Sequence, residues 1–229
     1  MSDFKCITVY CQRHAKPITH KNAETQCILG SRTDVSCSLE DLNLVSKTNL
    51  TFSQIYVSPL KRCQETALKI LGNEVFKSAK TAPEISEYDF GILDGKPFKD
   101  FTNQDNEIIE NFSKNPILHN IPKAQNYLDF SNKIRKFILD ILASSKDQEQ
   151  IMLITHLGVI SEILALFIDL PISKIITTLG TDYAMCTKLE FYVNTKVVIN
   201  NSDTYLSQDR LITLPSHIFA KIKNLNIKI

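Results

Sequence analysis

The chain has 229 residues, of which 43% are hydrophobic and 22% charged, and this length and composition suit one globular domain and exclude a wholly disordered chain. Its 26 basic and 25 acidic residues leave a formal net charge of +1, so no long-range field would attract nucleic acid or an anionic membrane. The apolar runs are too short to span a bilayer and residues 1–11 lack the shape of a signal peptide, so we expect a soluble, cytoplasmic protein.

Strand and helix patterns alternate in the first half of the chain. Short apolar, β-branched runs predict strands, and a longer run after Ser58 predicts a helix because Pro59 suits a first helical turn. We expect strands at Phe4–Cys11, Gln54–Val57 and Phe76–Ala82, and helices at Leu39–Lys47 and Pro59–Leu71.

The second half repeats this alternation. Apolar residues recur at helical spacing across Ala124–Ser144, and an apolar strand at Gln150–Thr155 leads into His156. An apolar helix begins at Gly158, and Pro171 is expected to stop it because proline cannot continue a helix. We expect a hairpin from Met185–Tyr192 and Lys196–Asn200, followed by a tail without a motif.

Strands separated by helices predict an α/β fold, a three-layer sandwich with a mostly parallel central sheet. We expect one domain over residues 1–229, with an insertion at about 95–123, where the pattern is polar and partly helical, and a C-terminal extension at about 202–229. Parallel sheets of this kind bind ligands beyond the carboxyl ends of their strands. Polar residues that follow a predicted strand are therefore the first candidates for a site.

The six cysteines show neither a C-x-x-C pair nor a regular spacing. Zinc sites and disulfide scaffolds need such pairs or spacings, so we expect no metal site and mostly structural, reduced thiols. The cysteines are Cys6, Cys11, Cys27, Cys37, Cys63 and Cys186.

Strong cations and imidazoles follow three of the predicted strands. Arg13 and His14 come after the first strand, Arg62 lies one helical turn after the second, and His156 follows the strand at 150–155. The chain has only five arginines beside 21 lysines, so two arginines close after predicted strands indicate a binding role more strongly than they would in an arginine-rich chain. Each guanidinium group can donate two parallel hydrogen bonds to phosphate oxygens. Imidazoles and a helix N-terminus add positive electrostatic potential. These residues together predict a pocket for a phosphoryl group.

Such a pocket supports phosphoryl transfer. An uncharged imidazole can attack phosphorus and form a phosphohistidine, which water then hydrolyses without a metal or another cofactor. The arginines would stabilise the charge on the transferring group. Glu87, in the loop after the third predicted strand, is the best-placed acid to protonate an alkoxide leaving group. Glu84 and Asp89 lie close to it in the sequence, so a solvated role for Glu87 stays open.

Four segments resemble the motifs of one family. Gln12-Arg13-His14-Ala15 resembles the R-H-G signature of the histidine phosphatase superfamily, the phosphoglycerate mutase-like proteins, with alanine in place of glycine. Segments 58–67, 87–91 and 155–160 resemble its S-P-L-x-R-x-x-[QE]-T-A, E-x-x-x-G and [ST]-H-x-G-V-I motifs, in the family's order. The resemblance covers roughly residues 4–200 and implies a phosphoglycerate mutase-like fold. It also implies His14 as nucleophile, Glu87 as proton donor, and Arg13, Arg62 and His156 as phosphate ligands.

The chain departs from the family's pattern around the expected pocket. Lys16, Pro17 and His20 stand where an acidic residue, a serine or threonine and an asparagine are common, and Leu157 replaces a small residue. We expect Lys16 to add positive charge and Leu157 to narrow the pocket. His20 either replaces the amide as a donor or is a solvated loop residue. Arg32 resembles part of a substrate-side loop of the alpha-ribazole phosphatase branch, although an exposed cation fits it equally well.

Three functions are consistent with these residues. The first is a metal-independent phosphomonoesterase for a small phosphorylated metabolite, similar to alpha-ribazole phosphatase. The second is a phosphoglycerate mutase-type phosphotransferase, which the lack of an adjacent arginine pair disfavours. The third is a catalytically weak phosphate-binding or interaction module. The departures from the family's pattern suggest it, and the presence of all five residues that the resemblance implies for catalysis and phosphate binding disfavours it. The substrate is not predicted, because the region at about 98–125 that would contact it matches no motif. The oligomeric state is not predicted either.

Overall fold

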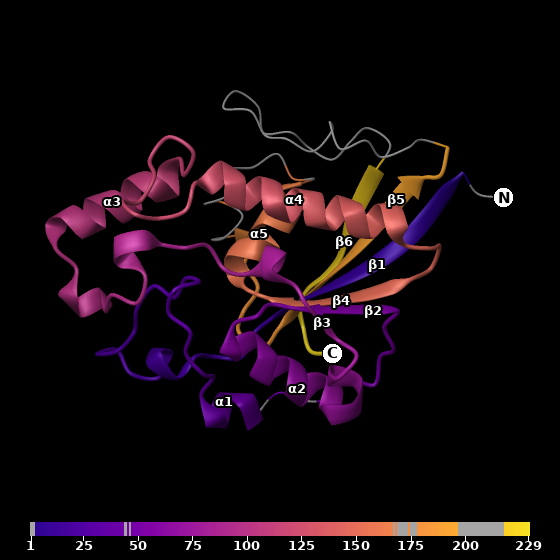
Figure 1. Ribbon diagram of the computed structural model, residues 1–229, viewed down its shortest axis with the longest axis horizontal. Coiled ribbons are helices and arrows are strands. Elements are labelled where there is room, and N and C mark those ends of the chain that lie inside the picture. The colour runs from indigo at the N-terminus through magenta and orange to yellow at the C-terminus, as the bar shows by residue number, and fades with distance from the viewer. Residues whose placement is uncertain are drawn as a thin grey trace.

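A six-stranded sheet forms the centre of the computed structural model, which describes residues 3–43, 45, 47–166, 168, 174, 178–196 and 218–229 (Figure 1). Its strands are β1 (Phe4–Arg13), β2 (Gln54–Val57), β3 (Lys80–Thr81), β4 (Gln150–Thr155), β5 (Cys186–Asn194) and β6 (Ile218–Ile227). Within the described residues they lie in the order β3-β2-β4-β1-β5-β6.

Most neighbours in this sheet are parallel. β1 pairs with β4, β4 with β2 and β2 with β3 in parallel registers, whereas β5 is antiparallel to β1 and β6 to β5. The predicted mostly parallel sheet is therefore confirmed, with an antiparallel edge at β5 and β6. Parallel neighbours need long crossover connections, and helices supply them here.

Helices cover both faces of the sheet, which confirms the predicted three layers (Figure 1). Helices α1 (Leu39–Asn43) and α2 (Lys61–Phe76) lie on one face, and α4 (Tyr127–Ser144) and α5 (Leu157–Ala165) on the other. Helix α3 (Asn103–Lys114), within the expected insertion, lies on the side toward which β1 runs from the N-terminus. No helix in the described part of the chain is long and apolar enough to cross a membrane.

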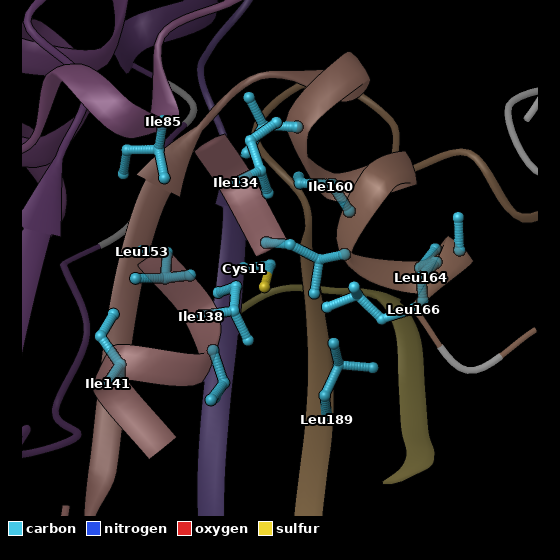
Figure 2. Close-up of a cluster of buried hydrophobic side chains, with 14 of the residues drawn as sticks. Cys11, Ile85, Ile134, Ile138, Ile141, Leu153, Ile160, Leu164, Leu166 and Leu189 are labelled. Atoms are coloured by element: carbon cyan, nitrogen blue, oxygen red, sulfur yellow. The ribbon is translucent and has the colours of Figure 1, made fainter. Parts of the chain in front are cut away.

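The alternation of side chains along the buried strands supplies both faces of the core. On β4, Leu153 belongs to the apolar cluster with α4 and α5, whereas Met152 and Ile154 belong to the cluster with α2. Successive strand residues point to opposite faces, so an unbroken apolar run fits a strand covered on both sides. Figure 2 shows Leu153 in the first cluster with Ile138 of α4 and Ile160 of α5.

The third strand is much shorter than predicted. We predicted a strand at Phe76–Ala82, but α2 continues to Phe76 and β3 contains only Lys80 and Thr81. The chain passes through Gly72, whose φ of 74° suits glycine, and then resumes helical geometry. Phe76 packs against the cluster beside α2, so tertiary packing overrides the local strand pattern.

Three predictions for the C-terminal half fall partly outside the described residues. Helix α5 ends at Ala165, before the expected stop at Pro171, which lies outside the described residues. The expected second hairpin strand, Lys196–Asn200, also falls mostly outside them, and the described partners of β5 are β1 and β6. The end of the expected C-terminal extension supplies β6, which adds a strand to the edge of the sheet.

Candidate active site

The ends of β1 and β4 bring two histidines together. The parallel register places Arg13 opposite Thr155, so the residues that follow, His14 and His156, leave the sheet side by side. The His14 N–H donates to the Thr155 carbonyl at 3.0 Å, and the two imidazole centroids are 5.1 Å apart. The pair therefore lies where parallel sheets gather their functional groups.

Hydrogen bonding selects one tautomer of His14. Its Nδ1 lies 2.7 Å from the Ala15 carbonyl oxygen, which can only accept, so Nδ1 carries the proton and Nε2 the lone pair. Burial, followed by the charges of Arg62 and Arg13, holds the pKa of His14 well below its usual value. The surroundings thus favour a neutral imidazole whose Nε2 is basic and nucleophilic.

His156 is fully buried where α5 begins. Its Nε2 lies 2.7 Å from the Ser58 Oγ, and the Cys63 Sγ lies 3.4 Å from the same nitrogen and 3.9 Å from Nδ1. Burial, followed by the charge of Arg62, keeps the pKa of His156 well below its usual value. Ser58 and Cys63 therefore orient a neutral imidazole beside His14.

Arg62 is fully buried near the start of α2. Its terminal nitrogens donate to the Gly30 carbonyl at 3.0 Å and to the Thr33 carbonyl at 3.1 Å. Its Nε has no hydrogen-bond partner within the described residues. A buried N–H without an acceptor is costly, so a ligand oxygen beside this nitrogen would be stabilised.

Arg13 is held by the segment that precedes β5. Its Nη1 donates to the Thr181 carbonyl at 2.7 Å, and its Cζ lies 3.8 Å from the centroid of the Tyr183 ring. The same ring lies 5.6 Å from the His14 ring. Like Arg62, Arg13 has a buried Nε without a hydrogen-bond partner in the described part of the chain. Burial lowers the pKa of Arg13, but a guanidinium stays charged in proteins.

Glu87 lies in the loop after β3 and brings a carboxyl group to the site. The residue is 8% exposed. Its Oε1 accepts from the Tyr88 N–H at 3.0 Å, and its Oε2 accepts from the Gly158 N–H at 3.3 Å. A Cβ at position 158 would lie 2.3 Å from Oε1, so glycine leaves the carboxyl group its place. Burial raises the pKa of Glu87, which suits a proton donor.

A cavity of about 370 Å³ opens beside these groups, a volume that suits a small ligand. Arg62 and His156 do not line it and are fully buried, with His156 next to His14. Its lining includes Arg13, His14, Glu87 and Leu157.

The three predicted rim residues have different positions. His20 lines the cavity, its ring 6.0 Å from that of Tyr183, and burial lowers its pKa. Lys16 instead lines a second cavity of about 230 Å³, whose wall also includes Tyr183. The Arg32 Nε lies 2.7 Å from an Asp89 carboxylate oxygen, and Arg32 does not line the main cavity. The geometry therefore supports a rim position for His20 and gives none for Lys16 or Arg32.

Sequence reasoning missed the role of Tyr183. The residue lies outside the four motifs, and an aromatic residue beside a strand is ordinarily a core residue. Its contact with Arg13 forms because the Arg13 N–H donates to the Met185 carbonyl at 2.9 Å, which holds this segment against the end of β1. No local sequence signal reports such a long-range contact.

The thiols and acids of the chain form neither disulfides nor a metal cluster in the described part. All six cysteines are free, and five of them are buried. Within the described residues, no group of three or more histidine, cysteine, aspartate or glutamate side chains could hold a metal ion.

The chain belongs to the histidine phosphatase superfamily (branch 1), whose family model matches residues 43–204. The predicted family is thereby confirmed. The matched stretch contains Arg62, Glu87 and His156, whereas Arg13 and His14 precede it. The structure joins the two parts, because β1 places His14 beside His156.

Curated relatives of the chain include two proteins with phosphatase names. One, from Hydrogenobacter thermophilus, has the name of a phosphoserine phosphatase. It is 25% identical over 124 residues, which are 53% of this chain and 58% of the relative. The adenosylcobalamin/alpha-ribazole phosphatase of Escherichia coli is 28% identical over 125 residues, which are 53% of this chain and 59% of the relative. The chain thus matches less than two thirds of the length of either relative.

Solved structures with similar architecture cover nearly the whole chain. The alpha-ribazole phosphatase from Shigella flexneri has a TM-score of 0.70 at 19% identity, over 96% of both chains. A mycobacterial glucosyl-3-phosphoglycerate phosphatase has a TM-score of 0.64 at 17% identity, over 81% of this chain and 91% of its own. At such identities the likeness establishes the fold, and it confirms the predicted phosphoglycerate mutase-like architecture.

Proposed function

We propose that this chain is a phosphomonoesterase that transfers the phosphoryl group of a small metabolite to His14 and then to water. The observation that carries the proposal is the state of His14. Its Nδ1–H is committed to the Ala15 carbonyl, so Nε2 keeps its lone pair, and the residue lines a cavity with Arg13 and Glu87. The superfamily and the phosphatase names of its relatives support the same class of reaction.

In the proposed complex, phosphate oxygens accept hydrogen bonds from the Nε atom of Arg13, which lines the cavity, and from that of Arg62, which lies outside the described lining and which the phosphate must approach when it binds. Both atoms are buried without a partner in the described residues, and both guanidinium charges lower the pKa of His14. If the Ser58 hydroxyl donates to Nε2 of His156, its Nδ1 carries the proton, and a phosphate oxygen would be a stronger acceptor for that proton than the Cys63 Sγ at 3.9 Å. These donors are positioned before the charge develops, which is how such sites stabilise a transition state.

The first chemical step breaks the bond between phosphorus and the leaving oxygen. The Nε2 lone pair of His14 forms a bond to phosphorus, and the electron pair of the breaking bond goes to the leaving oxygen. That oxygen takes the proton of the Glu87 carboxyl group, whose raised pKa keeps the proton available. The products are a phosphohistidine, an alcohol and the Glu87 carboxylate.

The second step hydrolyses the phosphohistidine. The Glu87 carboxylate takes a proton from a water molecule as the water oxygen attacks phosphorus. The bond to Nε2 breaks and its electron pair returns to the imidazole. Inorganic phosphate leaves, and both residues regain their starting protonation states.

Phosphatase activity is tested by phosphate release from p-nitrophenyl phosphate in the presence of EDTA. We expect turnover in EDTA, and a loss of at least about 10³-fold in kcat for His14→Ala, because the nucleophile is removed. The matched control is His119→Ala, which changes an exposed histidine outside the cavity and should retain full activity.

Retained activity in His14→Ala would contradict the proposal, and so would activity that EDTA abolishes. Phosphate binding without turnover of any ester would favour the binding module. The mutase alternative has less support, because no lysine and no second arginine contribute to the described lining of the cavity, where a second phosphate would need them.

A further inference from the structure

Five aromatic side chains that pack against one another contribute to the lining of the cavity beside His14. Tyr88 lies in their middle, with the rings of Phe90, Phe112 and Phe130 at centroid distances of 5.0, 5.2 and 5.3 Å. Phe112 comes from α3, so the expected insertion contributes to this surface. We call Tyr88, Phe90, Phe112, Tyr127 and Phe130 the aromatic wall.

The two tyrosine hydroxyls of the aromatic wall are already satisfied by the protein. The Tyr88 hydroxyl lies 2.9 Å from both the Asn120 Oδ1 and the Gln125 carbonyl oxygen. The Tyr127 hydroxyl donates to the buried Glu162 carboxyl group. None of these three partners lines the cavity. The tyrosines therefore keep their polar groups bonded elsewhere, so the small part of each that borders the cavity, with Tyr88 2% and Tyr127 9% exposed, offers a ligand an apolar contact.

Few of the described lining residues carry a charge or an imidazole. Among the described lining residues, the charged or imidazole side chains are Arg13, His14, His20 and Glu87. A carboxylate or second phosphate on the leaving group would enter the aromatic wall without a cation to replace its water, which is costly. An apolar ring would lose only its contact with water there, which is favourable.

The proposed proton donor adjoins the aromatic wall. Glu87 directly precedes Tyr88 and accepts a hydrogen bond from its backbone N–H. A leaving oxygen that takes the Glu87 proton must therefore lie beside the aromatic wall. The rest of the leaving group, which is bonded to that oxygen, then lies against the aromatic wall. Building on the proposed function, we propose that the substrate is the phosphate monoester of an alcohol that carries an aromatic or similarly apolar ring.

The substrate class is tested with three esters of primary alcohols, so that the bond being broken is the same. They are 2-phenylethyl phosphate, propyl phosphate and O-phosphoserine. We expect kcat/KM for the phenylethyl ester to exceed the other two by about 10-fold or more, because the ring is buried only in that complex. Equal values, or a preference for O-phosphoserine, would overturn the proposal.

Variants of the chain locate the preference. Phe112→Ala removes one ring of the aromatic wall and should lower the ratio of kcat/KM for phenylethyl to propyl phosphate toward one. The control is Phe98→Ala, whose ring is 45% exposed, packs on Phe101 and does not line the cavity, so this variant should keep the ratio. An unchanged ratio in a folded Phe112→Ala variant would contradict the assignment.

Binding to the wild-type chain separates this inference from the proposed function. The Kd of 2-phenylethylphosphonate and of propylphosphonate, which contain no ester bond to hydrolyse, is measured by calorimetry. A Kd about 10-fold lower for the phenylethyl compound supports the aromatic wall even if no ester is turned over. Equal Kd values refute it even if His14-dependent phosphatase activity is found.

Discussion

At the scale of single residues, the site depends on two pKa values that move toward each other. The proposed first step needs a neutral His14 and a protonated Glu87 at the same pH. With ordinary pKa values the carboxyl group loses its proton before the imidazole does, so few molecules would hold both forms. Burial lowers the pKa of His14 and raises that of Glu87, which increases this population.

The pH dependence of the reaction tests this arrangement. With 2-phenylethyl phosphate, a poor leaving group, we expect kcat/KM to fall as rising pH deprotonates Glu87, and to fall as acid protonates His14 at a pH below its ordinary pKa. Glu87→Gln cannot donate the proton, so it should lose the alkaline fall and about 10²–10⁴-fold in rate. The loss should be small with p-nitrophenyl phosphate. An equal loss with both esters would show that Glu87 is not the proton donor.

Single residues also show what a sequence can and cannot reveal about a site. Arg13, His14 and His156 could be singled out because each follows a recognisable apolar strand. Tyr183 could not, because its contact with Arg13 depends on how a distant segment packs at the end of β1. Local sequence patterns likewise could not predict the positions of Lys16 and Arg32, because ion pairs and cavity walls form only in the folded chain.

At the scale of elements, the junction of β4 and α5 positions both His156 and the Glu87 carboxyl group. His156 directly follows the last residue of β4 and occupies the N-cap position of α5, and the N–H of Gly158 in the first turn donates to Glu87. Short apolar runs predicted β2 and β4, and the helical spacing of apolar residues predicted all of α4. The strand predicted at Phe76–Ala82 was wrong over most of its length, because this segment mixes polar and apolar residues in a pattern that fits a helix end as well as a strand.

Gly158→Ala tests this junction. The added Cβ would lie 2.3 Å from the Glu87 Oε1 and must displace the carboxyl group, so we expect slower turnover of poor leaving groups. A double-mutant cycle provides the control: in the Glu87→Gln background, Gly158→Ala should cost much less than in the wild type. Additive losses in the cycle would mean that position 158 acts independently of Glu87.

At the scale of the whole molecule, the parallel register of one sheet assembles the site from both ends of the chain. β1 and β4 bring His14 to His156, α2 adds Arg62 from beside β2, and the loop after β3 adds Glu87 (Figure 1). The alternation of strands and helices predicts this meeting point, because parallel strands end at one edge. The aromatic wall was not predictable, since it joins α3 and α4 to that loop by packing that no motif marks.

The central claim is that the phosphoryl group passes through His14, and trapping the intermediate tests it most directly. The chain is mixed with 2-phenylethyl phosphate, quenched in alkali within the first turnover and digested for tandem mass spectrometry. We predict a phosphoryl group on His14, labile to acid and absent from His14→Ala. p-Nitrophenyl phosphate, a good leaving group, is used in parallel so that formation of the intermediate is the faster step. Phosphorylation of a different residue, or a burst of p-nitrophenol equal to the enzyme concentration without a phosphoryl group on His14, would contradict the account.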